Sequence, residues 1–482
     1  MTARARWWAL AAVSLATLMT YLDNNVINVA IPTIQRSLHL SVSGLEWIVS
    51  SYLLVLAGLL LVGGLLADIY GRRRIFLIGL TIFTLSSLAS GLAGSGGVLI
   101  GARAVQGLGA ALLMPTTLAI LAHAFTDVRE RSAAIGIWAA VGALGLAVGP
   151  LVGGIISQHI HWGWIFLINV PIGVATFAIA LPFIEESRAE ARTRRLDIPG
   201  LITSAVALFA LTYALIEGQD RGWTSGPIVA AFAVAAVGAA AFLAVERRTA
   251  QPMVPLGVFR AREFSGGTTT MMIWSFGILG IYFFTSLYLQ QILGFSPTKA
   301  GLSFVPMALF IALAATLAPR VAARFGAHRT VSFGVLLMVV GLLLFVRLGS
   351  GATFAALMPG FAVFGVGAGL MNVPLTNSVL DGLPAGQAGM ASALLNNSRE
   401  TAGLLGITVI GAVLRTRQGD ALRGGASTSQ AFIDGYHTGL WVTIGLLAAG
   451  VVLSYVTLRP RAQAPAEVAS LPEAEPAPAD VR

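Results

Sequence analysis

Cysteine is absent from the 482 residues of this chain, and charged side chains are scarce, at 11% of the total. Without cysteine the chain cannot form disulfides, thiolate metal sites or cysteine nucleophiles. Ordinary soluble domains carry roughly 25% charged residues, so this composition points away from them. The 6 histidines are scattered without the spacing of metal ligands. We therefore expect no metal site and no cofactor.

Apolar residues are abundant, at 56% of the chain, and the mean hydropathy is +0.82. This composition predicts an all-α integral membrane protein. Stretches long enough to cross about 30 Å of hydrocarbon predict fourteen spans, at 7–31, 45–66, 75–93, 97–122, 131–157, 164–184, 197–216, 228–246, 264–292, 298–323, 329–347, 352–380, 388–414 and 437–458. The longest outer loop is predicted at 415–436, so no soluble catalytic domain has room and we expect no enzyme.

Basic residues are unevenly divided between the two sides that these spans define. Of the 30 Lys and Arg, 21 fall on the side shared by both termini and 7 on the other, while Arg103 and Arg399 lie within spans. Cytoplasmic loops carry an excess of basic residues, so we predict a multi-pass protein of the plasma (inner) membrane with both termini cytoplasmic. The same bias explains the net charge of +9, and we expect no nucleic acid among the partners.

An internal repeat relates the two ends of the chain. Residues 104–112 recur at 362–370 with six of nine positions identical, at an offset of 258. Spans 1 to 6 therefore pair with spans 9 to 14. The predicted domains are an N-terminal six-helix bundle (1–186), an inserted two-helix hairpin (187–250), a C-terminal six-helix bundle (251–459) and a disordered cytoplasmic tail (460–482). Two such halves usually enclose a substrate site near the midplane, which predicts a transporter.

Two charged residues lie inside spans of the N-terminal half. Asp23 is in the middle of the first span, where an ionised carboxylate costs about 3 kcal/mol or more and is usually kept for function. Arg103, in the fourth span, cannot lose its charge, and its repeat partner is Phe361, so the repeat does not require it. We predict that both take part in proton coupling; for Arg103 the alternative is snorkelling toward an interface.

The loop between spans 2 and 3 combines charges with glycines. Asp68 can pair with Arg72, while Gly64 and Gly71 permit close approach and a tight turn. These four residues are predicted to form a conformational gate that stabilises one state of a rocking bundle. The alternative is that the arginines of this loop only anchor it on the cytoplasmic side.

Small residues are regularly spaced in the fifth span. Gly145, Gly149 and Gly153 lie four residues apart on one helix face, and Pro150 removes a backbone hydrogen bond. By itself this spacing indicates close helix packing, which is common in membrane proteins. It becomes more informative when it is read beside the other motifs.

Several segments together resemble the major facilitator superfamily. They are 64–74, 99–107 and 145–154, with 22–32, 162–171, 254–260 and 288–297 resembling in particular its fourteen-helix drug/proton antiporters of the EmrB/QacA type. The likeness covers essentially residues 1–458. One departure is the pair Asn24 and Asn25, where a Thr-Val-like pair is common in that family.

The resemblance implies a major facilitator fold of two six-helix bundles plus two inserted helices. It also implies an antiporter, driven by the proton-motive force, that exports amphipathic drugs or antibiotics by alternating access. Asp23 is then expected to carry the coupling proton and to face the central cavity, with Arg103 tuning its charge. The segment 145–154 matches the motif associated with antiporters, which implies a flexible seam between the halves.

Aromatic and polar residues of several spans are expected to line the substrate cavity, because aromatic surface suits varied amphiphiles and attracts cations. The candidates are Asn24, Asn28, Trp138, Trp274, Tyr282, Phe283, Tyr288, Gln291, Asn396, Asn397, Arg399 and Glu400. The alternative for the aromatic residues is contact with lipid. For Arg399 and Glu400 it is a structural network between helices; the two point about 100° apart on a helix and need not pair.

The expected partners are a small amphipathic substrate, protons and the lipid bilayer, and we expect a monomer. Two other functions remain open. One is a proton-coupled exporter of a specific lipid or natural-product metabolite, and the other is a non-transporting membrane receptor. A proton-coupled importer is disfavoured because the fifth span resembles that of antiporters.

Overall fold

The computed structural model describes residues 3–188, 197–382 and 388–459, and within these ranges it contains helices and no strand. The predicted all-α membrane fold is therefore confirmed. The tail that we predicted to be disordered, 460–482, lies outside the described residues.

The helices follow one another along the chain with short connections. The first seven are α1 (Ala3–Leu38), α2 (Val42–Tyr70), α3 (Arg72–Gly91), α4 (Gly96–Ala124), α5 (Val128–His159), α6 (Trp164–Leu167) and α7 (Asn169–Phe183). A hairpin of α8 (Ile198–Arg221) and α9 (Gly226–Arg248) follows. The remainder consists of η1 (Leu256–Arg260), α10 (Arg262–Leu287), η2 (Tyr288–Ile292), α11 (Pro297–Phe325), α12 (Ala327–Val346), α13 (Phe354–Asp381), α14 (Ala388–Arg423) and α15 (Thr428–Thr457).

Within the described ranges, twelve helices are long and apolar enough to cross a membrane, with α6 and α7 counted as one. Helices α1 and α14 are not among the twelve, although each has 36 residues, well above the roughly 20 that a span needs. Both are more polar than the rest. Helix α1 carries Asp23, and α14 carries Arg399 and Glu400. The fourteen predicted spans correspond to the twelve apolar helices together with these two.

The predicted outer loop at 415–436 is wrong. Helix α14 continues to Arg423 and α15 begins at Thr428, so most of the segment is helical. The apolar pattern stops near Leu414, but Arg, Gln, Ala and Leu are all good helix formers and the helix continues. The helix ends at Arg423, and two glycines follow it. Gly425 has a φ of 86°, a conformation that suits a glycine after a helix. Arg415 therefore lies inside α14.

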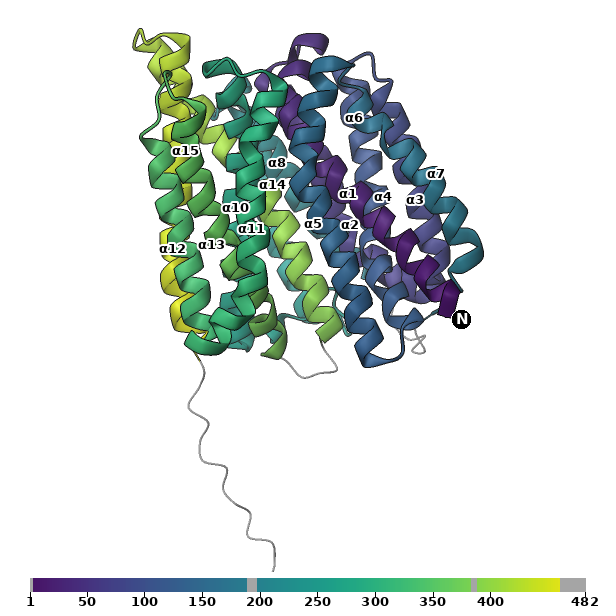
Figure 1. Cartoon of the computed structure of the whole chain (residues 1–482). Coiled ribbons are helices and arrows are strands. Elements are labelled where there is room, and N and C mark those ends of the chain that lie inside the picture. The colour runs from purple at the N-terminus through teal and green to yellow at the C-terminus, as the bar shows by residue number, and fades with distance from the viewer. Residues whose placement is uncertain (1–2, 189–196, 383–387, 460–482) are drawn as a thin grey trace, which may run out of the picture.

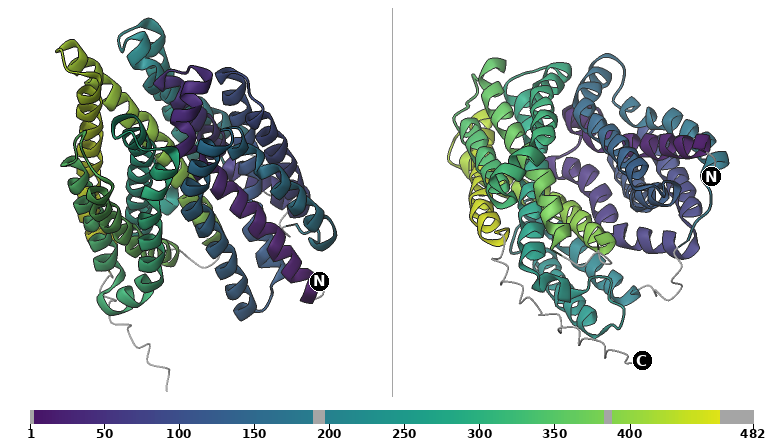
Figure 2. Two further views of the ribbon diagram at one scale, coloured as in Figure 1. Left: turned by 45° about the horizontal axis from the view of Figure 1, so that its top comes forward. Right: turned by 60° about the horizontal axis from the view of Figure 1, so that its bottom comes forward.

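Helix packing repeats between the two parts of the chain (Figures 1 and 2). Helix α1 packs on α5 and α7, and α4 packs on α2 and α3; correspondingly, α10 packs on α14 and α15, and α13 packs on α11 and α12. Glycines with positive φ occur at equivalent corners, Gly71 (114°) before α3 and Gly326 (87°) before α12. The domain boundaries given above remain predictions.

Two equivalent helix pairs join the halves, α5 with α11 and α2 with α14. The halves are also bonded directly at one end of the molecule, which we call the closed end. There, η2 binds α1: Gln291 Nε2 donates to Gln35 Oε1 (2.8 Å), and Gln290 Nε2 donates to the Val29 carbonyl (2.9 Å). The opposite end, which we call the open end, carries both the N-terminus and the end of α15 (Figure 1).

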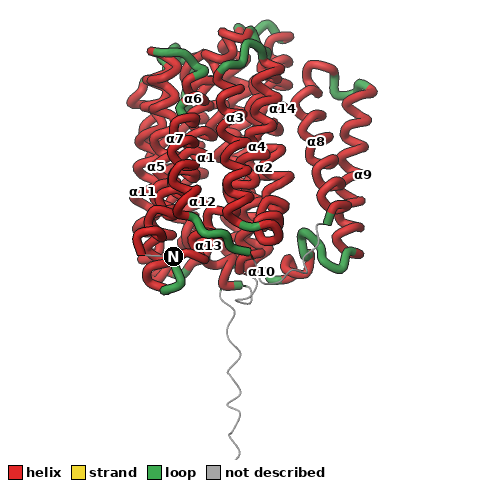
Figure 3. Tube along the Cα trace, turned by 90° about the vertical axis from the view of Figure 1, so that its right-hand side faces the viewer, coloured by secondary structure: helices red, strands yellow, loops and turns green. Residues whose placement is uncertain are grey.

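The α8–α9 hairpin stands to one side of the bundle (Figure 3). Of its two helices, α8 is the one that contacts α2 and α14. The hairpin therefore covers one of the two equivalent interfaces between the halves.

Candidate functional site

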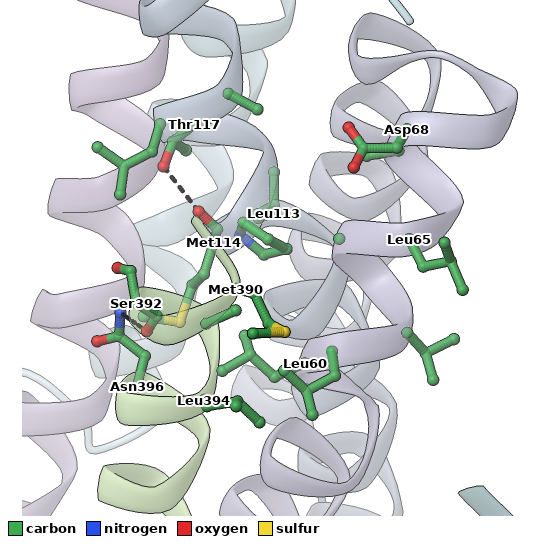
Figure 4. A pocket seen from close by; sticks show the side chains of 18 of the residues that line it. Leu60, Leu65, Asp68, Leu113, Met114, Thr117, Met390, Ser392, Leu394 and Asn396 are labelled. Atoms are coloured by element: carbon green, nitrogen blue, oxygen red, sulfur yellow. Dashed lines mark hydrogen bonds between the residues drawn. The ribbon is translucent and has the colours of Figure 1, made fainter. Parts of the chain in front are cut away.

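A cavity of about 940 Å³ lies between the two halves and extends to the open end. One wall comes from α1, α2, α4 and α5, and the facing wall comes from the start of α14 and the 251–255 segment. Figure 4 shows Met390, Ser392 and Asn396 of α14 across from Leu60 and Leu65 of α2. A cavity of this size can hold a drug-sized molecule, since small-molecule sites measure roughly 300–1,000 Å³.

Part of the predicted lining is found in this cavity. Trp138, Asn396 and Glu400 line it, together with Gly64, Asp68 and Arg72 of the predicted gate. Lining residues that we did not predict include Thr17, Thr20, Tyr21, Met114, Met253 and Met390. The spacing of Thr17, Thr20 and Tyr21 on one face of α1 was the available signal.

Four residues predicted to line the cavity lie elsewhere, at the closed end or within the C-terminal half. The ring of Tyr282 packs on that of Phe304 at 4.1 Å, and Phe283 is fully buried. Tyr288 donates its hydroxyl to the Gly349 carbonyl (2.7 Å). Gln291 binds Gln35 at the closed end. Their side chains contact other residues, and none of the four lines the cavity.

The remaining candidates also lie outside the lining. Asn28 donates to the Asn24 carbonyl (3.3 Å), which satisfies it along α1 itself. Trp274, Asn397 and Arg399 are not among the lining residues either. Asn24 is likewise absent from the lining.

Asp23 is enclosed in a polar cage within the N-terminal half. Its Oδ2 lies 2.6 Å from Nη1 of Arg103 on α4, and both side chains are 0% exposed. Its Oδ1 accepts hydrogen bonds from Gln106 Nε2 (2.9 Å) and Asn169 Nδ2 (2.8 Å). Ser87 of α3 accepts a further bond from Asn169 Nδ2 (3.0 Å). Four helices thus meet around one carboxylate.

Arg103 has several partners inside this cage, although its Nη2 is buried without a hydrogen-bond partner among the described residues. Its Nη1 donates to Gln106 Oε1 (2.7 Å), and its Nε donates to the Ile48 carbonyl (3.4 Å). The guanidinium also lies over the Tyr52 ring, 4.2 Å from its centroid, an arrangement that stabilises a desolvated cation. Because the side chain is fully buried, the snorkelling alternative is wrong.

The expectation that Asp23 faces the central cavity needs correction. The α1 residues that line the cavity are Ala16, Thr17, Thr20 and Tyr21. Asp23 is not among them, although it lies only about 60° around α1 from Thr20. It is 0% exposed because Arg103, Gln106 and Asn169 enclose it. The carboxylate therefore lies beside the cavity-lining face of α1 but is closed off from the cavity by its polar neighbours.

The predicted gate residues come together at the open end. Arg72 Nη2 lies 3.1 Å from Asp68 Oδ1, and Arg72 Nη1 donates to the Ala119 carbonyl (3.4 Å). We did not predict the part played by Glu186, which follows α7. Its carboxylate accepts from the backbone N–H groups of Arg73 (3.1 Å) and Arg74 (3.2 Å). Glu186 therefore caps the start of α3 and ties α7 to the gate.

The glycines of α5 face α1, in the same half. A Cβ added at Gly145 would lie 3.1 Å from the Leu18 carbonyl oxygen, and one at Gly153 would collide with the carbonyl of Val26. The seam with the other half is made by the neighbouring residues. The Pro150 carbonyl lies against Gly301, and Gly154 lies against the Pro297 carbonyl of α11. Helix α5 is therefore packed closely on both sides.

Arg399 and Glu400 form an ion pair with each other, which their positions on a helix did not require. Arg399 Nη2 lies 2.7 Å from Glu400 Oε1. Arg399 also interacts with the phenol of Tyr21 on α1, and its carbonyl accepts from Ser275 Oγ (2.7 Å). The pair links α14 to α10 and to the α1 face of the cavity.

Comparisons with known proteins agree with this geometry. Residues 13–407 match the family model of the Major Facilitator Superfamily. The chain is similar to the multidrug resistance protein Stp of Mycobacterium tuberculosis (38% identity, over 85% of this chain and 76% of that protein). It is similar to the methylenomycin A resistance protein of Streptomyces coelicolor (36%, 84% and 85%) and the puromycin resistance protein of Streptomyces alboniger (33%, 96% and 94%). The solved structure of the POT family transporter PepTSo shares the fold, with a TM-score of 0.70 and 13% identity over 95% of this chain and 98% of that one.

Proposed function

Because this chain belongs to the major facilitator superfamily, we propose that it is an antiporter, driven by the proton-motive force, that exports small amphipathic drugs or antibiotics across the plasma membrane. The single observation that carries this proposal is the fully buried Asp23, bound by Arg103, Gln106 and Asn169. The names of the similar proteins, which include multidrug and antibiotic resistance, support the substrate class. In this proposal the open end and both termini face the cytoplasm.

Proton exchange at Asp23 changes the cage. An ionised carboxylate only accepts hydrogen bonds, whereas a protonated one also donates, so protonation weakens the bond to Arg103 and disturbs one of the two amide bonds. Arg103 keeps its charge and is then held by Gln106, the Ile48 carbonyl and the Tyr52 ring. Proton uptake from outside and substrate release share this change, so each disfavours the presence of the other ligand.

Helix α1 connects the proton to the substrate and to the seam. Thr20 and Tyr21 line the cavity, Asp23 lies in the cage, and Val26 packs against Gly153 of α5. A rearrangement of the cage therefore moves the wall of the cavity and the helix that meets the other half. This continuity is the physical basis for coupling by alternating access.

The cavity suits a substrate that is largely apolar with a limited charge. Its lining contains Met114, Met253 and Met390, whose flexible thioethers adapt to varied shapes. Trp138 and Tyr21 add aromatic surface. Three carboxylates line the cavity. Asp68 and Glu400 are each paired with an arginine, and Asp197 caps the start of α8, so the walls supply polarity without a large excess of free negative charge.

A second candidate function is the export of one specific natural product. The observation that favours it is that two of the similar proteins are named for resistance to a single antibiotic each, methylenomycin A and puromycin. A screen that finds one strong substrate and no others supports this candidate over multidrug export.

The test is a resistance screen with dyes, quaternary ammonium compounds and antibiotics, followed by substrate-driven proton flux in proteoliposomes. We expect Asp23→Asn to lower resistance by about tenfold or more and to abolish proton flux, because the amide cannot exchange a proton near neutral pH. Asp420→Asn, at an exposed position of α14, is the matched control and should behave as wild type. Unchanged resistance in Asp23→Asn, together with no substrate-driven proton flux in the wild type for any compound, contradicts the antiporter and favours a non-transporting receptor.

A further inference from the structure

The interface between α2 and α14 buries an ion pair for which the proposed mechanism has no use. Glu46 of α2 is 0% exposed and Arg415 of α14 is 6% exposed, with Arg415 Nη2 lying 3.1 Å from Glu46 Oε2. The other carboxylate oxygen, Oε1, is buried and has no hydrogen-bond partner among the described residues. Burying two charges costs several kcal/mol per ion unless the pair is well satisfied. Such an arrangement therefore requires an explanation.

The equivalent interface between α5 and α11 closes without charge. There, Gly154 packs on Pro297 and Gly301 packs on the Pro150 carbonyl, and no ion pair joins the described residues of these two helices. The repeat relates the two interfaces, so closing this end of the molecule does not in itself demand an ion pair. The difference is that α8 covers only the interface with the charges (Figure 3).

Helix α8 binds both sides of the charged interface. Its Glu217 accepts from Trp47 Nε1 of α2 (2.9 Å), and its Gln219 accepts from Thr416 Oγ1 of α14 (3.1 Å). Asp220 of α8 lies 3.7 Å from Arg415 Nη1 and is 49% exposed. Arg415 therefore sits between a buried carboxylate on α2 and a hydrated one on α8.

We propose that the Glu46–Arg415 ion pair is an electrostatic latch on the closed end, and that Asp220 of α8 holds Arg415 when the latch opens. The proposal rests on the alternating access of the proposed function. When α2 and α14 separate, Glu46 becomes hydrated and Arg415 leaves it. Because Asp220 is already nearby, Arg415 retains a counter-ion throughout, which lowers the cost of opening. This gives the inserted hairpin a task in the transport cycle.

The roles of Glu46 and Asp220 in the latch can be distinguished by experiment. The charged groups that face Glu46 are Arg415 from α14 and Glu217 and Asp220 from α8. Glu217 is engaged by Arg221 at 3.0 Å and by Trp47, so it is not free to receive Arg415. Removing Glu46 should therefore favour the open conformation, whereas removing Asp220 should favour the closed one.

The experiment measures the distance between spin labels at the closed end of the two halves. Arg36→Cys and Ser350→Cys place labels at exposed positions, in the last turn of α1 and after α12, and the chain has no other cysteine to react. In Glu46→Gln we expect the ratio of long to short distances to rise about tenfold or more, because Arg415 loses its partner only in the closed state. In Asp220→Asn we expect the same ratio to fall severalfold.

Asp420→Asn, on the same helix but paired with Arg423 at the surface, is the control and should leave the distances unchanged. If Glu46→Gln does not fold, Glu46→Asp keeps the charge, shortens its reach and should shift the ratio in the same direction by less. An unchanged ratio in folded Glu46 variants overturns the latch, and a shift of the same sign in Asp220→Asn overturns the transfer to α8. The measurement needs neither substrate nor a proton gradient, so a failed transport assay and a failed latch are separate results.

Discussion

The centres of the two halves occupy equivalent positions and are built from opposite kinds of side chain. The N-terminal centre contains Asp23, Ser87, Arg103 and Gln106, all buried and joined through the polar cage. The residues 258 positions later are Ile281, Phe345, Phe361 and Phe364, and all four line one small apolar pocket of about 20 Å³. A charged centre in one half therefore corresponds to a hydrocarbon centre in the other.

The aromatic centre shows what the fold itself requires. The Phe361 ring packs edge-on against Phe345 and Phe304, with centroids 4.9 Å and 5.2 Å apart, a geometry that aromatic pairs favour. The same helix arrangement is thus stable with no charge at this position. The ion pair of the N-terminal half is not needed for folding in general, and the difference assigns the proton chemistry proposed above to that half.

The largest effect is expected when one charged residue of the N-terminal centre is replaced by its apolar counterpart from the C-terminal centre. Asp23→Ile leaves Arg103 buried without its counter-ion, which should cost about 3–5 kcal/mol of stability and abolish transport. Adding Arg103→Phe should restore much of the stability but no transport. Thermal unfolding of the purified variants measures this, and equal melting temperatures for the single and double variants would contradict the assigned role of the pair.

A second variant disturbs the aromatic centre instead. Phe361→Ala leaves a void among Phe304, Phe345 and Phe364, and we expect a loss of about 3 kcal/mol or more. The number of protons moved per substrate should stay the same, because Asp23 is untouched. The number of protons per substrate is measured in proteoliposomes. A change in this number without a loss of stability would show that the C-terminal half takes part in proton coupling, which contradicts our comparison.

A smaller effect is expected from one neutral member of the cage. Gln106→Leu removes a donor to Asp23 and an acceptor for Arg103 Nη1, and losing a hydrogen bond to a charged group should cost about 1.5–3 kcal/mol. Phe364→Leu, at the equivalent position, keeps an apolar contact and should cost less. Comparing the two melting temperatures and the two export rates checks whether polar satisfaction matters only in the N-terminal half.

The smallest effect concerns a pair of equivalent glycines. Gly145→Ala presses a methyl group against the Leu18 carbonyl at 3.1 Å, which should cost about 1 kcal/mol because backbone must shift. Gly403→Ala meets the end of the Leu279 side chain, which can rotate away, so its cost should be lower. A larger loss of stability in Gly403→Ala would show that the C-terminal half is the more tightly packed one.

Long apolar stretches were enough to predict the helices, because membrane spans are defined mainly by length and composition. The cage was only partly predictable. Asp23 and Arg103 stand out as charges inside spans, but their pairing depends on which faces of α1 and α4 meet, and spacing along the chain does not reveal that. Asn169 is a polar residue in an apolar run, and this was the signal that could have added it.

Arg415 illustrates the opposite limit. Polar residues after Leu414 ended the apolar stretch, so Arg415 was assigned to a loop, whereas good helix formers carry α14 on to Arg423. Its partner Glu46 lies 369 positions earlier. Aromatic residues misled in another way, because Tyr282 and Phe283 are buried among their own neighbours. Composition identifies residues that suit a cavity, but it does not say which side of a helix meets the cavity.

Helix α1 borders the cavity and the cage with neighbouring parts of one side. Thr20 lines the cavity and Asp23 lies in the cage, about 4.5 Å further along the helix axis and about 60° around it. No chain of intermediate residues is needed to connect substrate and proton, since three positions of one helix separate them. A turn of α1 by about 60° about its own axis would bring Asp23 toward the cavity.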